Sequence, residues 1–233
     1  MVDNKKSEVT GFILNRVFFR LLVTVLLVVF GWLAGWYLQG HSISSWRESN
    51  YFTSSFRVAY LAFLFAEAAI ITFLAPRSAQ VTDDAARSWY HMRLVMWETL
   101  LVLAVFSDCM RILPIGTTSA PRWIGIALLL IGLLLYASAG AARRVEFQRN
   151  PEKTFPTGGI FKVIRFPETL ASLFIAFGTA LVFNAWAGLF IAFISMIIIA
   201  GFITAQDKSQ LNTLRSPWAE YQVHTKRIIP FIW

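Results

Sequence analysis

The chain has 233 residues, of which 57% are hydrophobic and only 15% are charged. A soluble domain averages about 25% charged residues, and the apolar excess here lies in runs of roughly 17–20 residues, long enough to cross a hydrocarbon core. This composition excludes an ordinary soluble enzyme and indicates an integral membrane protein. Cys109 is the single cysteine, which excludes an internal disulfide, and the three histidines are scattered, so no metal site is expected.

The apolar runs predict an all-α fold with about six transmembrane helices. In chain order the predicted spans cover residues 21–38, 58–74, 94–112, 123–139, 169–183 and 188–204. The last two spans are joined by little more than Asn184-Ala185-Trp186, which predicts a tight helical hairpin.

The basic residues predict how these spans are oriented. Six spans place both termini on one side, and only four of the 21 Lys and Arg residues fall on the other side, namely Arg47, Arg57, Arg111 and Arg122. Cytoplasmic loops collect Lys and Arg, so both termini are predicted to be cytoplasmic. The net charge of +8 therefore reflects topology and attraction to anionic membrane lipids. No basic soluble domain is present that would predict nucleic-acid binding.

Two polar segments lie on the same predicted side of the membrane. The first contains the paired Gly158-Gly159, then Arg165 and Pro167-Glu168 at the start of the fifth span. Paired glycines allow close backbone approach, Pro167 suits the first position of a helix, and Arg165 is placed to hold a carboxylate. The local residues equally allow a plain loop with Arg165 as an interfacial anchor.

The second polar segment is the C-terminal tail. It carries Asp207, Glu220, Tyr221 and His224, and Tyr221 and His224 share one helical face. Because both segments flank the hairpin, we expect them to converge at the membrane surface and form a pocket that is open both to a water-soluble cofactor and to a lipid-borne substrate. The alternative is a solvated amphipathic tail anchored by Trp233.

The last third of the sequence resembles a known family. Integral membrane methyltransferases typified by isoprenylcysteine carboxyl methyltransferase and the phospholipid methyltransferases carry Gly-Pro-Tyr and Arg-His-Pro-x-Tyr-Leu before a tight hairpin. After the hairpin they carry a Glu-Glu pair, x-Glu-Tyr and a closing Pro-Arg-x-Ile-Pro. The matching positions here read Gly159-Ile160-Phe161, Arg165-Phe166-Pro167-Glu168-Thr169-Leu170, Asp207-Lys208, Glu220-Tyr221 and Lys226-Arg227-Ile228-Ile229-Pro230.

The resemblance implies a site for S-adenosylmethionine on the cytoplasmic side and a lipophilic acceptor that enters from the bilayer. It implies a methyltransferase-like core at residues 141–233 behind a four-span region at residues 1–140. By position, the resemblance gives catalytic roles to Arg165 and Glu220. The residues that it places at the cofactor are Gly159, Phe161, Arg165, Phe166, Pro167, Asp207 and Tyr221.

Three positions depart from the family pattern, and they leave a second function open. Phe166 replaces the His, Thr169 replaces the Tyr, and Asp207-Lys208 replaces the Glu-Glu pair. The alternative is a catalytically degenerate protein of the same fold that serves as a structural subunit of a larger membrane complex. A small transporter is a third alternative, although no pair of Gly/Pro-broken spans supports it.

Two carboxylates lie within predicted spans. Glu67 and Glu98 sit at a similar depth in the second and third spans, where ionisable groups are usually paired or face a cavity. They are candidates for binding the acceptor, or equally for pairing with Arg87 or Arg93. Asp108 and Arg111 are predicted to form a local ion pair.

Overall fold

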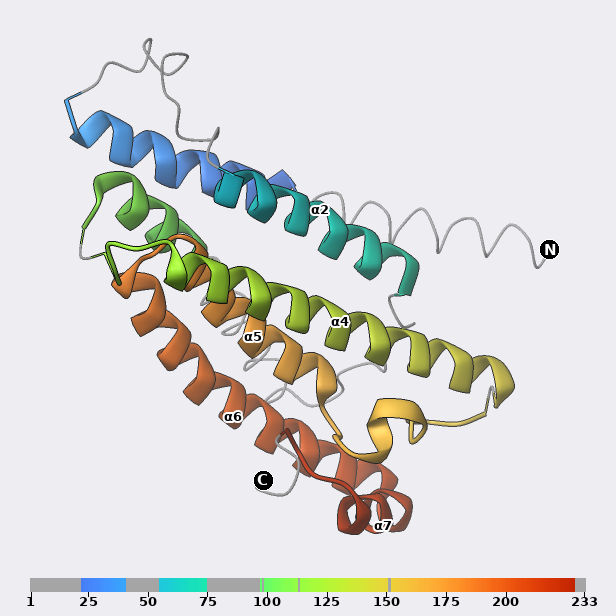
Figure 1. The fold of residues 1–233 in the computed structure, drawn as a ribbon. Helices are drawn as coiled ribbons and strands as arrows, with labels where there is room; N and C mark the ends of the chain where they lie inside the picture. Colours follow the sequence, from blue (N-terminus) through green and yellow to red (C-terminus); the bar gives the residue numbers. More distant parts are fainter. Residues whose placement is uncertain are drawn as a thin grey trace.

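The computed structural model describes residues 22–40, 55–74, 97, 99–112, 114–150 and 152–228, and the side chains of 68 and 71–74 are outside that description. Its regular structure is helical, with two isolated β-bridges (Figure 1). The helices are Leu22–Leu38, α2 (Ser55–Leu74), Thr99–Met110, α4 (Ala120–Arg149), η3 (Gly159–Lys162), α5 (Pro167–Val182), α6 (Trp186–Leu214) and α7 (Ser216–His224). The all-α prediction is therefore confirmed for the described residues.

Two of these helices, α4 and α6, are long and apolar enough to cross a membrane. Three shorter apolar helices accompany them, namely Leu22–Leu38, Thr99–Met110 and α5. Both long helices extend about ten residues beyond their predicted spans, to Arg149 and Leu214. At a rise of about 1.5 Å per residue each extension is about 15 Å long. Figure 1 shows both extensions at the same end of the bundle, beside η3 and α7.

Glycines bring α4 and α5 into close contact. A Cβ on Gly125 would lie 2.6 Å from the amide nitrogen of Val182, and one on Gly132 would lie 2.7 Å from Cγ1 of Ile175. On α5, a Cβ on Gly178 would lie 2.9 Å from the carbonyl oxygen of Gly125. Small residues that let helix backbones approach are typical of helix packing in membranes. This contact fixes α5 against α4. The first polar segment leads directly into the start of α5.

The predicted tight hairpin between α5 and α6 is present. Asn184 adopts a left-handed φ of 51°, and the Ala185 amide donates to the carbonyl oxygen of Ala180 at 3.1 Å. The Asn184 side chain donates to the Gly116 carbonyl at 2.8 Å and accepts from the Gly116 amide at 3.2 Å. The turn is thereby tied to the segment that precedes α4.

The hairpin end of the bundle also holds a charged cluster. Asp108 forms ion pairs with Arg57 at 2.8 Å and with Arg122 at 3.2 Å, and its side chain is only 5% exposed. The predicted pair between Asp108 and Arg111 is wrong, because Arg111 adopts a positive φ at the end of its helix and its side chain is exposed. The turn there directs Asp108 toward α2 and α4 instead.

Candidate functional site

The two polar segments converge, as the sequence predicts. The Arg165 amide donates to the Lys226 carbonyl at 2.7 Å, and the Phe166 amide donates to the Arg227 carbonyl at 3.1 Å. In return, the Lys226 amide donates to the Val163 carbonyl at 3.1 Å, which gives a short parallel bridge. The segment entering α5 and the chain after α7 are therefore joined through their backbones.

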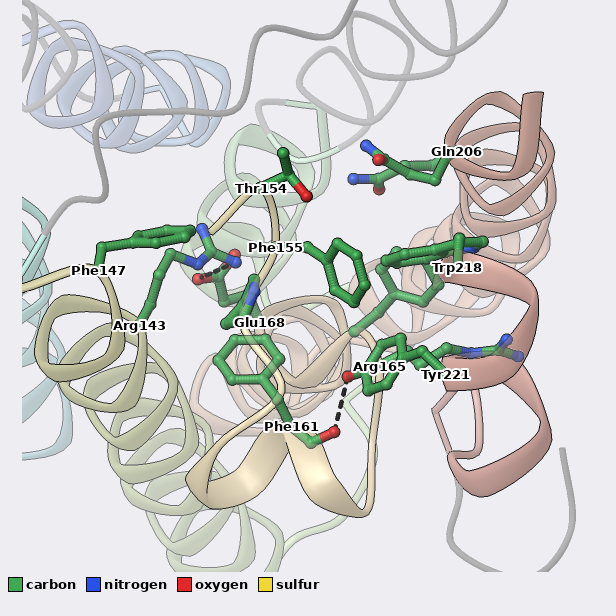
Figure 2. Close-up of a pocket in the computed structure, with 13 residues that line it drawn as sticks. Arg143, Phe147, Thr154, Phe155, Phe161, Arg165, Glu168, Gln206, Trp218 and Tyr221 are labelled. Atoms are coloured by element: carbon green, nitrogen blue, oxygen red, sulfur yellow. Dashed lines mark hydrogen bonds and ion pairs between the residues drawn. The ribbon is translucent and has the colours of Figure 1, made fainter. Parts of the chain in front are cut away.

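A cavity of about 150 Å³ lies between these segments and the extensions of α4 and α6 (Figure 2). Its lining residues are Arg143, Phe147, Thr154, Phe155, Pro156, Phe161, Arg165, Phe166, Glu168, Gln206, Gln210, Trp218 and Tyr221. Ligand pockets are commonly ~300–1,000 Å³, and at ~30 Å³ per water this cavity corresponds to about five waters. It is smaller than the predicted site for S-adenosylmethionine, because aromatic side chains occupy part of the space.

Aromatic rings form one wall of the cavity. The Phe155 ring lies 5.1 Å from that of Trp218 and 5.3 Å from that of Tyr221, and Trp218 and Tyr221 are also 5.3 Å apart. Figure 2 shows Phe155 at the centre of the view, facing this pair. The Tyr221 hydroxyl donates to the Phe161 carbonyl at 2.6 Å, which fixes the ring orientation. Such a wall offers π faces to an organic cation or a flat base.

Asp207 lies behind this wall and organises it. Its carboxylate accepts from Trp218 Nε1 at 3.0 Å, from Gln222 Nε2 at 2.9 Å and from Arg227 Nε at 3.0 Å. Its side chain is 3% exposed and does not line the cavity. Asp207 therefore holds α7 and the chain after it against α6.

Arg165 lines the cavity beside Asp207. Its Nη1 lies 3.5 Å from Oδ1 of Asp207, and its side chain is only 7% exposed. Its Nε and Nη1 have no hydrogen-bond partner among the described residues. Burial lowers the pKa of Arg165 and the Asp207 carboxylate opposes that shift, so the guanidinium stays charged. Buried N–H groups of this kind favour a ligand that brings acceptor oxygens.

A second arginine lines the cavity on the side opposite the aromatic wall. Arg143 Nη2 forms an ion pair with Oε1 of Glu168 at 3.0 Å, drawn in Figure 2. The Arg143 guanidinium also lies over the Phe161 ring, 5.4 Å from its centre. Its Nε is buried and has no hydrogen-bond partner in the described part of the chain.

Glu146 on α4 anchors the loop that leads to η3. Its carboxylate accepts from the amides of Thr157 at 2.8 Å and Gly158 at 2.7 Å, and it also binds the Lys153 ammonium. The next residue, Gly159, has φ +58°, and a Cβ there would lie 2.9 Å from Cβ of Ala142. This anchoring places Phe155 on one side of the cavity and Phe161 on another.

The predicted site residues fall into three groups. Phe161, Arg165, Phe166 and Tyr221 line the cavity, whereas Gly159, Pro167 and Asp207 shape it from outside. Glu220 is exposed on α7 and does not line the cavity, and the neighbouring Lys208 is also exposed. Glu67 is half-buried on α2 and is not part of the lining, and Glu98 lies outside the described residues.

Several cavity residues were missed by the sequence analysis. Arg143 is one of the Lys and Arg residues that predict the orientation of the spans, and it was not predicted to lie at the site. Phe155 and Trp218 belong to no matched motif, although Trp218 lies one helical turn before Tyr221, a spacing that places both on one face. Within the described residues, no group of three or more His, Cys, Asp or Glu side chains could hold a metal ion.

Comparison with known proteins identifies the class of this segment. Residues 120–213 match the family model described as phospholipid methyltransferase. The match covers α4, η3, α5 and nearly all of α6, which are the elements that build most of the cavity. The resemblance predicted from the motifs is thus confirmed for this part of the chain, and together with the two long apolar helices it indicates a membrane protein. No curated protein matches the chain.

Proposed function

We propose that this protein is an integral membrane methyltransferase that uses S-adenosylmethionine to methylate a lipophilic or membrane-embedded acceptor. Methyltransferases of the matched family generally depend on this cofactor. The observation that carries the proposal is the cavity where the two polar segments meet. Aromatic rings and arginine N–H groups without hydrogen-bond partners, among the described residues, line it together.

The residues at the cavity fit the polar and cationic parts of the cofactor. Arg165 and Arg143 have buried N–H groups for acceptor oxygens of the ligand, and Trp218 and Tyr221 offer ring faces to a sulfonium. When bound, the cofactor supplies a methyl group activated by the positive sulfur. The protein's task is to hold the acceptor in line with that methyl group and to exclude water, which requires positioning rather than a protein nucleophile.

The space present suits only part of the cofactor. A volume of about 150 Å³ accommodates the compact amino-acid end, and the adenosyl group requires the segment that carries Phe155 to move outward. We therefore expect binding to include a rearrangement of residues 152–158. Such a requirement lowers the apparent affinity by the fraction of molecules in the open form.

The proposal includes the topology predicted from the sequence. Six spans would place the cavity, both termini and most basic residues on the cytoplasmic side, with the Asp108 cluster at the outer end. In Figure 1 the hairpin end and the cavity end lie at opposite ends of α4, as this arrangement needs. Residues 1–140 remain the predicted accessory region, although α4 runs without a break across residues 140 and 141.

One observation favours the alternative of a catalytically degenerate subunit. Arg165 is already paired with Asp207, and aromatic rings fill much of the cavity, as expected for a site that has become a packed core. In this alternative the exposed apolar faces of the helices would contact other membrane subunits as well as lipid.

Calorimetry with S-adenosylmethionine on the purified protein distinguishes the two functions. The methyltransferase proposal predicts measurable heat of binding and thermal protection of the wild-type protein. It also predicts that Arg165→Ala abolishes binding, since Arg165 is the most deeply buried cation in the cavity wall. Lys208→Ala, which changes an exposed residue near Asp207, is the matched control and should bind normally. No heat and no protection at millimolar cofactor would favour the structural subunit.

A further inference from the structure

We propose that the Arg143–Glu168 ion pair binds the zwitterionic amino-acid group of the cofactor, with Arg143 on its carboxylate and Glu168 on its ammonium. This inference rests on the proposed function and assigns one part of that ligand to one place in the cavity. Neither residue belongs to the motifs that carry the family resemblance, since Arg143 precedes them and Glu168 occupies their variable position.

The pair has the charges that such a group requires, and both charges face the cavity. Arg143 comes from the extension of α4 and Glu168 from the first turn of α5, and both line the cavity. They share one contact, between Nη2 and Oε1. Arg143 Nε is buried without a hydrogen-bond partner among the described residues, so the guanidinium has a donor left for a ligand carboxylate.

The surroundings hold both side chains in place. The Arg143 guanidinium lies on the Phe161 ring, and the Tyr221 hydroxyl holds the Phe161 backbone in place by donating to its carbonyl. Glu168 lies at the positive end of α5, where a carboxylate is stabilised by the helix dipole. A ligand that brings both a carboxylate and an ammonium can replace one ion pair with two and leave no charge unpaired.

Arg165 does not offer the same combination. Its partner Asp207 does not line the cavity and already accepts three hydrogen bonds from Trp218, Gln222 and Arg227. The Arg165–Asp207 pair therefore presents a cation to the cavity but no accessible anion for an ammonium. Arg165 therefore supports the cavity wall that any part of the ligand needs, while the Arg143–Glu168 pair recognises the amino-acid group.

The test is a cycle of two ligands and three variants in binding calorimetry. S-adenosylhomocysteine carries the amino-acid group, whereas 5′-methylthioadenosine carries the same nucleoside thioether without it. Arg143→Met and Glu168→Gln should each weaken the binding of S-adenosylhomocysteine by roughly 10- to 100-fold, the range expected for a lost charge-assisted hydrogen bond. Neither variant should change the affinity for 5′-methylthioadenosine. Arg165→Met should weaken the binding of both ligands to a similar extent.

Equal losses for both ligands in Arg143→Met and Glu168→Gln would show that the pair only supports the fold, and would overturn the inference. Selective loss of S-adenosylhomocysteine in Arg165→Met alone would overturn it as well, by moving the amino-acid site to Arg165. If Arg143→Met fails to fold, Glu168→Gln decides the question, because it keeps the shape of the side chain. A wild-type protein that binds neither ligand would remove the proposed function and this inference together.

Discussion

Asp207 connects more of the site than any other described side chain. Its buried carboxylate contacts Arg165, Trp218, Gln222 and Arg227, which come from the entry to α5, from α7 and from the chain after it. Truncating it would remove a carboxylate that pairs with two arginines, Arg165 and Arg227. Removing one partner of a buried ion pair costs about 3–5 kcal/mol.

We therefore expect Asp207→Ala to lower the unfolding temperature of the detergent-solubilised protein clearly, and to expose Trp218 to a fluorescence quencher. Lys208→Ala is the matched control, because Lys208 is the adjacent residue and its side chain is exposed. If the two variants unfold at the same temperature, Asp207 does not have the structural role described here.

The protonation of Tyr221 makes the stability of the folded protein depend on pH in the alkaline range. Burial raises the pKa of Tyr221 above its usual value of about 10, and the nearby Arg165 opposes that shift only in part. The folded protein therefore binds this proton more tightly than the unfolded chain. The stability contributed by neutral Tyr221 is complete below about pH 10 and is lost as the pH rises further.

Tyr221→Phe should be less stable than the wild type at neutral pH by about 1 kcal/mol, since the hydrogen bond to the Phe161 carbonyl is lost. The difference in unfolding free energy should narrow above about pH 10, because only the wild type then loses the contribution of Tyr221. Denaturant titrations of both proteins between pH 8 and 11 would measure this difference in unfolding free energy. A constant difference over that range would contradict the prediction.

Individual side chains also show where sequence reasoning reaches its limit. The motif positions place Phe161, Arg165, Phe166 and Tyr221, and all four line the cavity. The motif positions also placed Glu220 at the site, but its side chain is exposed on α7 and does not line the cavity, whereas Arg143 lies in no motif. Both positions depend on which face of a helix turns inward. That face is decided by packing between different segments of the chain, such as the contacts of Arg143 with Phe161 and Glu168.

At the scale of elements, the turn at Gly159 positions η3 against α4. Its left-handed φ of +58° disfavours any side chain, and an added Cβ would lie 2.9 Å from Cβ of Ala142. Gly159→Ala should destabilise the protein by about 1–2 kcal/mol, through backbone strain and the close contact together. Thermal unfolding measures the total effect.

A second substitution separates these two causes. Ala142→Gly removes the Cβ that the new methyl group would meet, so the double variant should recover the part of the loss that comes from the contact. Gly40→Ala is a control for strain alone, because Gly40 also has a positive φ but an added Cβ would meet no described atom within 4 Å. Ala142→Gly alone is the reference, because glycine inside a helix costs about 1 kcal/mol by itself. If Gly159→Ala lowers stability as much in the Ala142→Gly background as in the wild type, α4 does not constrain this turn.

The length of the apolar runs predicts that the helices exist, but it does not predict where each helix ends. The hairpin and the starts of α5 and α6 lie within three residues of their predicted positions, because Pro167 and the Asn184 turn are local signals. The extensions of α4 and α6 were missed, since a hydrophobicity criterion ends a span where polar residues begin. Helical hydrogen bonds continue through polar residues, and those extra turns carry Arg143, Glu146, Gln206 and Asp207 to the site.

At the scale of the whole molecule, the two ends of the bundle carry different kinds of charge. The hairpin end holds the Arg57–Asp108–Arg122 cluster, in which one carboxylate pairs with two arginines. The cavity lies at the other end, where Figure 1 shows the extensions of α4 and α6, and these extensions carry basic residues. The rule that cytoplasmic segments are rich in Lys and Arg therefore predicts that the cavity end faces the cytoplasm.

Reporter fusions would test this orientation directly. A reporter active only in the cytoplasm should be active when fused to either terminus, and inactive when inserted after Gly116 in the segment that precedes α4. As a matched control, an insertion after Asn150 at the end of α4 should be active. An active reporter after Gly116 would contradict the predicted six-span arrangement.

The backbone bridge between Ile164 and Lys226 has a consequence for the making of the protein. Its two halves are separated in the chain by the whole of α5, α6 and α7. In the predicted six-span arrangement, both hairpin helices must enter the bilayer, and the chain must return to the side it left, before the second half of the bridge can pair with the first. Until then a nascent chain would have no complete pocket, so ligand binding would report that membrane insertion is complete.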